Sequence, residues 1–288
     1  LAFFKKNYNV ICMDHVLAAM YEGEKLPNNS LLLTFDDAYA EHFNHVYPIL
    51  RSMNMKGCFY IPAKTVLEHK VLDVNKIHFI LASGANISEL IDTLKQQINH
   101  FKSKYDLESF DYYYEELAVA NRFDTKDVIF VKRLLQHALP ESIRTLIVNA
   151  LFEQFIGIDE ESFAKELYMD EVQIRELLRG GMHIGCHGYD HYWWNRLSGQ
   201  ELGNELTKSH NFLSGLGCDM NDWTACYPYG SSSEQVVKAL SNLGCKLAFT
   251  TEMQVANLSS NHPLLIPRLD TNDLPKSQGG STNKWYIN

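Results

Sequence analysis

An apolar run ends abruptly on two carboxylates in Leu31-Leu32-Leu33-Thr34-Phe35-Asp36-Asp37. Such a run is typical of a buried parallel strand, because both faces of the strand are covered. The two acids would then lie at the carboxyl end of the strand, where open and barrel α/β folds place their chemistry. Alternatively, Asp36 or Asp37 only caps the next helix, which we expect to begin near Ala40.

Two histidines follow a second short apolar segment, well downstream of the acids. His187 and His191 are four residues apart, a spacing at which two imidazoles can face one point, and imidazole is the commonest protein ligand for zinc-like metals. Joined to the Asp-Asp strand end, the pair could supply one carboxylate and two imidazoles to a metal, with the second carboxylate free to act as a base. A site with three protein ligands keeps positions open for water and substrate.

Taken with Tyr227-Pro228-Tyr229-Gly230, these residues resemble the successive motifs of the polysaccharide deacetylases, the NodB-homology group or carbohydrate esterase family 4. The likeness covers residues 7–65 and 170–270 in the same order. The resemblance implies a deformed (β/α) barrel and a metal-dependent hydrolase that removes the N-acetyl group from an amino sugar or saccharide.

The resemblance also implies a role for each residue of the site. Asp37, His187 and His191 would hold a divalent metal, for which zinc is the first expectation and cobalt, nickel or manganese are alternatives. Asp36 would be the base that takes a proton from the attacking water. The backbone N–H at Tyr229 would help to bind the oxyanion.

The chain departs from the family pattern at three places. Ala38 stands where the family usually has glycine after the Asp pair. Cys226 stands where many members have an arginine that orients the base; Arg268 could supply that charge from the last strand, or it could form an ordinary surface ion pair. The late motif with the family's general acid has no clear match, and His262 is the nearest candidate by position.

The spacing of apolar residues predicts an α/β fold with a large helical insertion. Short strands and helices alternate on both sides of the Asp-Asp run, the pattern of a parallel sheet, whereas almost every segment from 73 to 179 has helical spacing. We expect a discontinuous barrel at 1–65 and 170–274, the insertion at 66–169 and a tail at 275–288. Within the insertion, Tyr112-Tyr113-Tyr114 either stack on sugar rings or pack helix against helix.

Composition excludes several classes of protein. The 288 residues are 45% hydrophobic and 21% charged, as in soluble globular proteins, with a net charge of −9 and no basic run, which argues against a nucleic-acid partner. No apolar stretch approaches the roughly 20 residues of a membrane span.

The six cysteines form no CxxC pair, which favours free thiols and a cytoplasmic location. The chain begins at Leu1, so we expect its natural start to be missing. The oligomeric state stays open.

Three functions are consistent with these observations. The first is removal of an N-acetyl group from a sugar during surface-polysaccharide biosynthesis. The second is an inactive family member that binds carbohydrate or acts as a scaffold. The third is a metal-dependent peptidase or cyclic amidase on the same scaffold.

Overall fold

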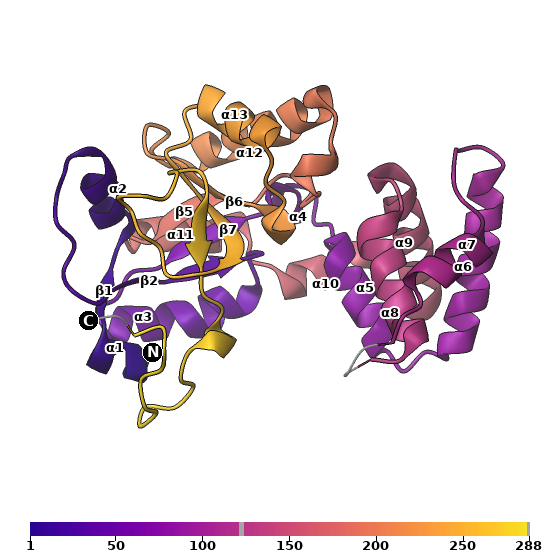
Figure 1. The fold of residues 1–288 in the computed structure, drawn as a ribbon, viewed down its shortest axis with the longest axis horizontal. Coiled ribbons are helices and arrows are strands. Elements are labelled where there is room, and N and C mark those ends of the chain that lie inside the picture. Colours follow the sequence, from indigo (N-terminus) through magenta and orange to yellow (C-terminus); the bar gives the residue numbers. More distant parts are fainter. Residues whose placement is uncertain (121–123, 287–288) are drawn as a thin grey trace. The chain divides into compact units, whose positions relative to one another are not determined.

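A computed structural model of the chain describes residues 1–120 and 124–286, and the chain divides into two compact units. Unit 1 comprises Leu1–His69 and Ala164–Asn288, and unit 2 comprises Lys70–Phe163 (Figure 1). None of the helices in the described ranges is long and apolar enough to cross a membrane. All six cysteines are free thiols.

Unit 1 is built around a curled sheet of six parallel strands in the order β3-β4-β5-β6-β7-β8 (Figure 1). A second, two-stranded parallel sheet pairs β1 with β2. This curled parallel sheet with its helices confirms the predicted deformed (β/α) barrel. The strands are β1 (Asn9–Ile11), β2 (Ser30–Leu32), β3 (Thr34–Asp36), β4 (Cys58–Ile61), β5 (His183–Cys186), β6 (Thr224–Cys226), β7 (Leu247–Met253) and β8 (Ile266–Arg268).

The strand predicted from the Asp-Asp run is interrupted. Leu33 separates β2, which pairs with β1, from β3, which pairs with β4 in the other sheet. The Leu33 carbonyl accepts a hydrogen bond from Cys58 N–H, so the chain changes partner at this residue. The prediction of a single strand was therefore wrong in detail, but β3 still carries Asp36 to the carboxyl edge of the six-stranded sheet.

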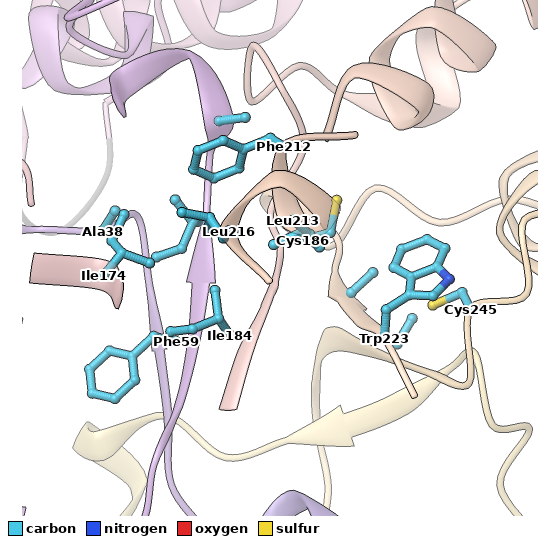
Figure 2. Close-up of a cluster of buried hydrophobic side chains, with 14 of the residues drawn as sticks. Ala38, Phe59, Ile174, Ile184, Cys186, Phe212, Leu213, Leu216, Trp223 and Cys245 are labelled. Carbon is cyan, nitrogen blue, oxygen red and sulfur yellow. The ribbon is translucent and has the colours of Figure 1, made fainter. Parts of the chain in front are cut away.

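Alternate residues of each strand enter two different cores. Phe59 and Ile184 pack on the outer face of the sheet beneath helices (Figure 2). Tyr60 and Cys226 lie on the inner face, in a cluster with the α2 residue Met13. Both faces are buried, as expected for a parallel sheet. The helices of unit 1 are α1 (Ala2–Asn7), α2 (Met13–Tyr21), α3 (Tyr47–Ser52), α4 (Ala63–Leu67), α11 (Glu171–Arg179), α12 (Gly199–Leu216) and α13 (Glu234–Asn242).

Helix α12 has clear start and stop signals in the sequence. Ser198 accepts a hydrogen bond from Glu201 N–H in a capping box, and Gly217 ends the helix in the left-handed conformation at φ 88°. The helix buries Leu206 and Leu213 against the sheet core. It also carries Glu205, an acidic residue that is buried.

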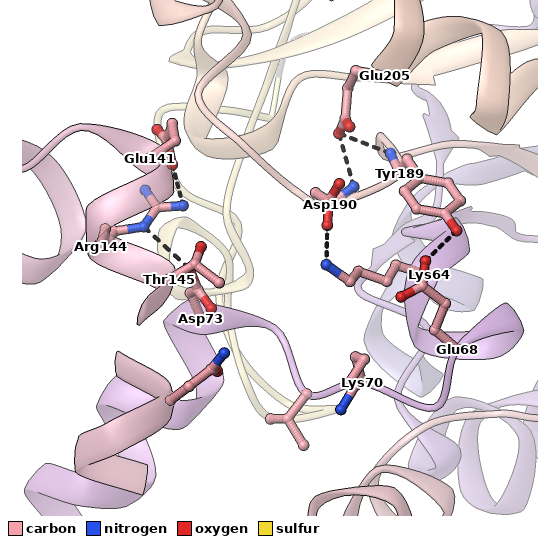
Figure 3. A network of polar contacts seen from close by, with 12 residues as sticks. Lys64, Glu68, Lys70, Asp73, Glu141, Arg144, Thr145, Tyr189, Asp190 and Glu205 are labelled. Carbon is pink, nitrogen blue, oxygen red and sulfur yellow. Dashed lines mark hydrogen bonds and ion pairs between the residues drawn. The ribbon is translucent and has the colours of Figure 1, made fainter. Parts of the chain in front are cut away.

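Unit 2 is helical and has its own core. Its only fully buried arginine in the described range, Arg144, is 2% exposed and pairs with Asp73 and Glu141 (Figure 3). Tyr113 is buried, and Tyr114 packs against aromatic rings of the same unit, which favours packing over sugar stacking for these two residues. Its helices are α5 (Asp73–Ala82), α6 (Ile87–Lys102), α7 (Phe110–Leu117), α8 (Lys126–Arg133) and α9 (Glu141–Phe155), and α10 (Glu160–Leu167) runs into unit 1.

Candidate active site

The six site residues predicted from the sequence meet at the carboxyl edge of the sheet. Asp36 ends β3 and Asp37 follows it; His187 and His191 follow β5; Tyr229 follows β6; and Arg268 ends β8. Parallel strands end at the same edge, so residues far apart in the sequence are brought to one place.

Asp37, His187 and His191 form a compact group of three candidate ligands. Asp37 Oδ1 lies 3.4 Å from Nε2 of each histidine, and the two Nε2 atoms are 3.2 Å apart. Asp37 Oδ1 is buried and makes no hydrogen bond to any described residue. A tetrahedral ion with ligand distances of about 2.1 Å holds its ligands about 3.4 Å apart. The spacing of the three atoms and their donor types therefore fit a divalent metal ion.

The orientation of His187 is fixed by a contact on its other ring nitrogen. His187 Nδ1 donates to the carbonyl of Cys226 at 2.8 Å, so in the neutral imidazole the lone pair lies on Nε2, the nitrogen next to Asp37. Metal-binding histidines commonly use such a bond to a backbone carbonyl to fix tautomer and ring orientation. The His187 side chain is only 4% exposed, so the surrounding residues restrict its position.

Asp36 is held by Arg268 rather than by the next helix. Arg268 Nη1 and Nη2 donate to Oδ1 and Oδ2 of Asp36 at 3.1 and 2.8 Å, and Nη1 also donates to Thr34 Oγ1 at 3.1 Å. The Cys226 thiol lies 3.4 Å from Asp36 Oδ2. Since the Arg268 side chain is only 18% exposed, the alternative of an ordinary surface ion pair is wrong.

The capping alternative for the two acids is also wrong. Helical backbone begins at Ala40, as expected, and continues into the π-helical segment His42–Val46, which no side chain caps. Asp36 is instead bonded to Arg268, and Asp37 faces the histidines. Both carboxylates therefore belong to the site.

Charges within the site shift the ionisation of its members. Burial would raise the pKa of Asp36, but the Arg268 guanidinium and His187 hold it below its usual value. Burial likewise opposes ionisation of Asp37, but the two imidazoles hold its pKa well below the usual range. Burial would lower the pKa of His187, yet the Asp37 carboxylate beside it raises it. The site thus keeps both carboxylates ionised.

Four residues of the edge have left-handed backbone conformations. Asp37, Ala38, His191 and Tyr229 have φ values of 74°, 59°, 59° and 57°. Each such residue other than glycine costs about 1–2 kcal/mol, and strain of this kind concentrates at functional sites. The conformation of Ala38 also explains why glycine is the expected residue at this position.

Aromatic rings connect two of the strand ends. The Tyr229 ring centroid lies 4.6 Å from that of His191 and 4.5 Å from that of Trp193, and the Tyr229 and Trp193 rings are stacked with an angle of 4° between their planes. Arg196 lies over the Trp193 ring, 5.6 Å from its centroid. The loop after β5, which carries His191 and Trp193, therefore packs against the loop after β6, which carries Tyr229, next to the candidate ligands.

His262 does not reach this edge. It precedes β8, and the carbonyl of the next residue, Pro263, accepts a hydrogen bond from Ala248 near the start of β7. His262 therefore lies at the amino end of the sheet, whereas Arg268 lies at the carboxyl end. The suggestion that His262 is the general acid was wrong, because His262 precedes β8 and only the far end of this strand, at Arg268, reaches the site.

A family model confirms what the motifs indicate. The model described as polysaccharide deacetylase matches residues 23–100 and 153–248. The chain belongs to the polysaccharide deacetylase family. The two matched segments include the Asp pair, the histidine pair and Tyr229, and the gap between them falls within unit 2. No curated protein sequence shows a significant match.

Solved structures share the fold at low sequence identity. The deacetylase PplD of Streptococcus pyogenes, in complex with acetate, is 15% identical, with a TM-score of 0.53, 92% of this chain covered and 75% of that chain. IcaB from Ammonifex degensii is 16% identical, with a TM-score of 0.54 and 94% and 81% covered. The deacetylase domain of BpsB from Bordetella bronchiseptica is 13% identical, with a TM-score of 0.53 and 92% and 79% covered.

Two contacts of the site lie beyond what the sequence indicates. The hydrogen bond of Arg268 to Thr34 joins the first and last strands of the sheet. Glu205 supports the backbone between the two histidines from α12. The sequence does not predict either contact, because it indicates only that Thr34 lies in a strand and that Glu205 is one of several acidic residues in a helix.

Proposed function

We propose that this family member is a metal-dependent hydrolase that removes the N-acetyl group from an amino sugar or saccharide, in the biosynthesis of a surface polysaccharide. The observation that carries the proposal is the group of Asp37 Oδ1 and the two histidine Nε2 atoms, within 3.2–3.4 Å of one another, beside a second carboxylate held by Arg268. Zinc is the metal we expect, because one carboxylate and two imidazoles are ligands that it favours.

A divalent ion held by Asp37, His187 and His191 would supply Lewis acidity, which polarises the acetamide carbonyl and makes water a stronger acid. Asp36 accepts the proton of the attacking water. Its low pKa keeps it ionised at neutral pH, and the two hydrogen bonds from Arg268 fix the plane of its carboxylate. Each carboxylate thus has one task.

Tyr229 serves the oxyanion that develops as water adds to the carbonyl. Its backbone follows β6 and has a left-handed conformation, and its ring packs on His191. A backbone N–H fixed near the reacting carbon costs little reorganisation, and such donors contribute about 10²–10³-fold to rate.

Acetate release from N-acetylated chito-oligosaccharides tests the proposal. Protein freed of metal by a chelator is reloaded with zinc, cobalt, nickel or manganese, and free acetate is measured for the wild type and for Asp36→Asn. We expect release with at least one metal and a loss of about 10³-fold or more in the variant, since the base is removed.

Two other outcomes would replace this proposal. Sugar binding without acetate release, unaffected by Asp36→Asn, would show the inactive carbohydrate-binding or scaffold protein. Activity on peptides or ring amides, with none on N-acetylated sugars, would show the peptidase or cyclic amidase.

A further inference from the structure

Both candidate histidine ligands lie at the ends of one five-residue loop, His187–His191, which we call the histidine loop. Its backbone is bonded to the start of α4: the carbonyl of Gly188 accepts from Ala63 N–H and that of Tyr189 accepts from Lys64 N–H, each at 3.0 Å. These two bonds fix one side of the loop. The N–H group of His187 donates to the Ile61 carbonyl, but the N–H groups of Tyr189 and Asp190, in the middle of the loop, need a different partner.

Glu205 of α12 is that partner. Its Oε1 accepts hydrogen bonds from the N–H groups of Tyr189 and Asp190, at 2.8 and 2.9 Å (Figure 3). Glu205 is only 4% exposed. A single buried oxygen thus holds two successive amides in the middle of the histidine loop.

The loop has the shape that this contact requires. Gly188 has a φ of 82°, a conformation that favours glycine. A Cβ at Gly188 would lie 2.8 Å from Glu205 Oε1 and 3.2 Å from Trp194 Nε1. The absence of a side chain at Gly188 therefore lets the carboxylate reach the two amides.

Side chains of the loop make further bonds to α4 and the residue after it. Asp190 pairs with Lys64, and the Tyr189 hydroxyl donates to Glu68 Oε1 at 2.5 Å (Figure 3). Lys64 and Asp190 remain partly exposed, at 26% and 16% of their side-chain area. The contact through Glu205 is the more deeply buried of these supports and acts on the backbone itself.

Keeping an acid at this position is costly. Burial, followed by the charge of Asp190, raises the pKa of Glu205 to about 7. An apolar side chain would avoid the cost of burying a carboxyl group, but it would leave two amide N–H groups without an acceptor. The arrangement is therefore suited to holding the loop rather than to filling the core.

We propose that Glu205 is a positioning residue for the metal site: by holding the amides of Tyr189 and Asp190, it sets the separation of His187 and His191 and so the affinity for the metal. This inference rests on the metal site proposed above. It assigns Glu205 no contact with the metal or the substrate.

The test compares Glu205→Met, which removes the acceptor and keeps an unbranched side chain, with Glu205→Gln, which keeps an acceptor oxygen. Leu206→Ala is the matched control, because Leu206 is the next residue of α12, is 1% exposed and packs in the sheet core. Two readouts are used. One is hydrogen exchange at the amides of Tyr189 and Asp190 without metal; the other is the affinity for zinc and the visible spectrum of the cobalt-loaded protein.

In Glu205→Met we expect exchange at the two amides to become at least about tenfold faster. We also expect metal affinity to fall by about 10–100-fold, as for other groups that orient metal ligands, and the cobalt spectrum to change. Glu205→Gln keeps an acceptor oxygen, so its metal affinity should stay within about threefold of the wild type, a much smaller change than the loss of about 10–100-fold expected for Glu205→Met. Leu206→Ala should lose stability and keep the wild-type metal affinity and spectrum.

Wild-type exchange and metal affinity in Glu205→Met would overturn the inference. So would an equal loss of affinity in Leu206→Ala, because a general loss of stability would then explain the result. If Glu205→Met does not fold, Glu205→Asp withdraws the carboxylate from the amides while keeping its charge, and the same losses are expected to a smaller extent. A wild type that binds neither metal would refute the metal site, while the exchange at Tyr189 and Asp190 would still decide whether Glu205 holds the loop.

Discussion

Arg268 and Asp36 join the two edge strands of the curled sheet at its carboxyl end. They are 232 residues apart in the sequence, and their two hydrogen bonds of 2.8 and 3.1 Å connect β8 to β3. The same guanidinium donates to Thr34 Oγ1 in β3 and to the Thr250 carbonyl in β7. The edge strands β3 and β8 are not paired with each other through their backbones in the six-stranded order, so the Arg268 side chain bridges them. The same contact orients the candidate base, Asp36.

Replacing Arg268 by lysine should reduce turnover while metal affinity stays unchanged. A lysine keeps the charge but cannot reproduce the two parallel hydrogen bonds of the guanidinium, so the carboxylate of Asp36 loses its fixed orientation. We expect kcat for acetate release to fall about 10–100-fold with little change in KM, as for the loss of a group that positions a catalytic residue. Arg51→Lys is the control, because the Arg51 side chain is 60% exposed. Equal kcat values for Arg268→Lys and the wild type would contradict the assigned role.

Removing the cation altogether should shift the pH dependence. The guanidinium of Arg268 lowers the pKa of Asp36, so in Arg268→Met this pKa should rise. The base would then be protonated at higher pH, and the acidic limb of the kcat/KM profile should move upwards relative to the wild type. Profiles of both proteins between pH 4 and 9 measure the shift; an acidic limb that stays in place or moves down would show that Arg268 does not control Asp36.

Variants of the metal ligands and a variant of the candidate base should differ in their affinity for the metal. Asp37→Ala or His191→Ala removes one of three ligands, and we expect each to lose metal affinity by several orders of magnitude together with activity. Asp36→Asn should lose activity and keep its metal, because Asp36 is held by Arg268 and lies outside the group of three. Metal content after dialysis against a chelating buffer distinguishes the two classes. Retention of metal by Asp37→Ala would disprove the ligand set.

The sequence alone predicts the parts of the site that local patterns carry. The Asp pair is visible because a buried strand ends on it, and the histidine pair is visible because four residues separate its members. Both belong to motifs of the family, and the parallel topology then implies that they meet.

Contacts that depend on the curvature of the sheet are not visible in the same way. The family resemblance offered Arg268 as the residue that orients Asp36, but no pattern near Arg268 specifies how far the sheet curls before β8 ends, so an ordinary surface ion pair remained an alternative. The break at Leu33 was missed because Leu31 to Leu33 have the same apolar character, while the change of strand partner depends on where β1 and β4 lie. His262 was misjudged because its position in the sequence does not reveal that it precedes β8 at the opposite edge.

Ala38 allows the strain at the site to be measured. It combines a φ of 59° with 1% exposure. Glycine would relieve about 1 kcal/mol of strain and lose a buried methyl group that contributes about 0.8 kcal/mol, so Ala38→Gly should change the free energy of unfolding by less than about 1 kcal/mol. In Ala38→Val, a branched side chain in the same conformation and a closed core should cost at least about 2 kcal/mol. Urea unfolding measures both, and a valine variant as stable as the wild type would rule out the strained conformation.

His183 should make the protein sensitive to mild acid. Its Nε2 lies 2.7 Å from Thr224 Oγ1, which lies 2.9 Å from the Tyr60 hydroxyl inside the curled sheet. Burial lowers the pKa of His183 to about 4, whereas an unfolded histidine has a pKa of about 6.5. Between these values the unfolded chain binds a proton that the folded chain does not, so this residue's contribution to stability is lost as the pH falls from about 6.5 towards 4. At pH 5 the loss is about 2 kcal/mol relative to pH 7.5.

The variant His183→Gln keeps a group that can bond to Thr224 but does not titrate. Between pH 7.5 and pH 5, its free energy of urea unfolding should therefore fall by about 2 kcal/mol less than that of the wild type. His45→Gln, at an exposed position, serves as the control and should retain the wild-type pH dependence. If His183→Gln and the wild type lose stability equally over this interval, His183 is not held neutral in the folded protein.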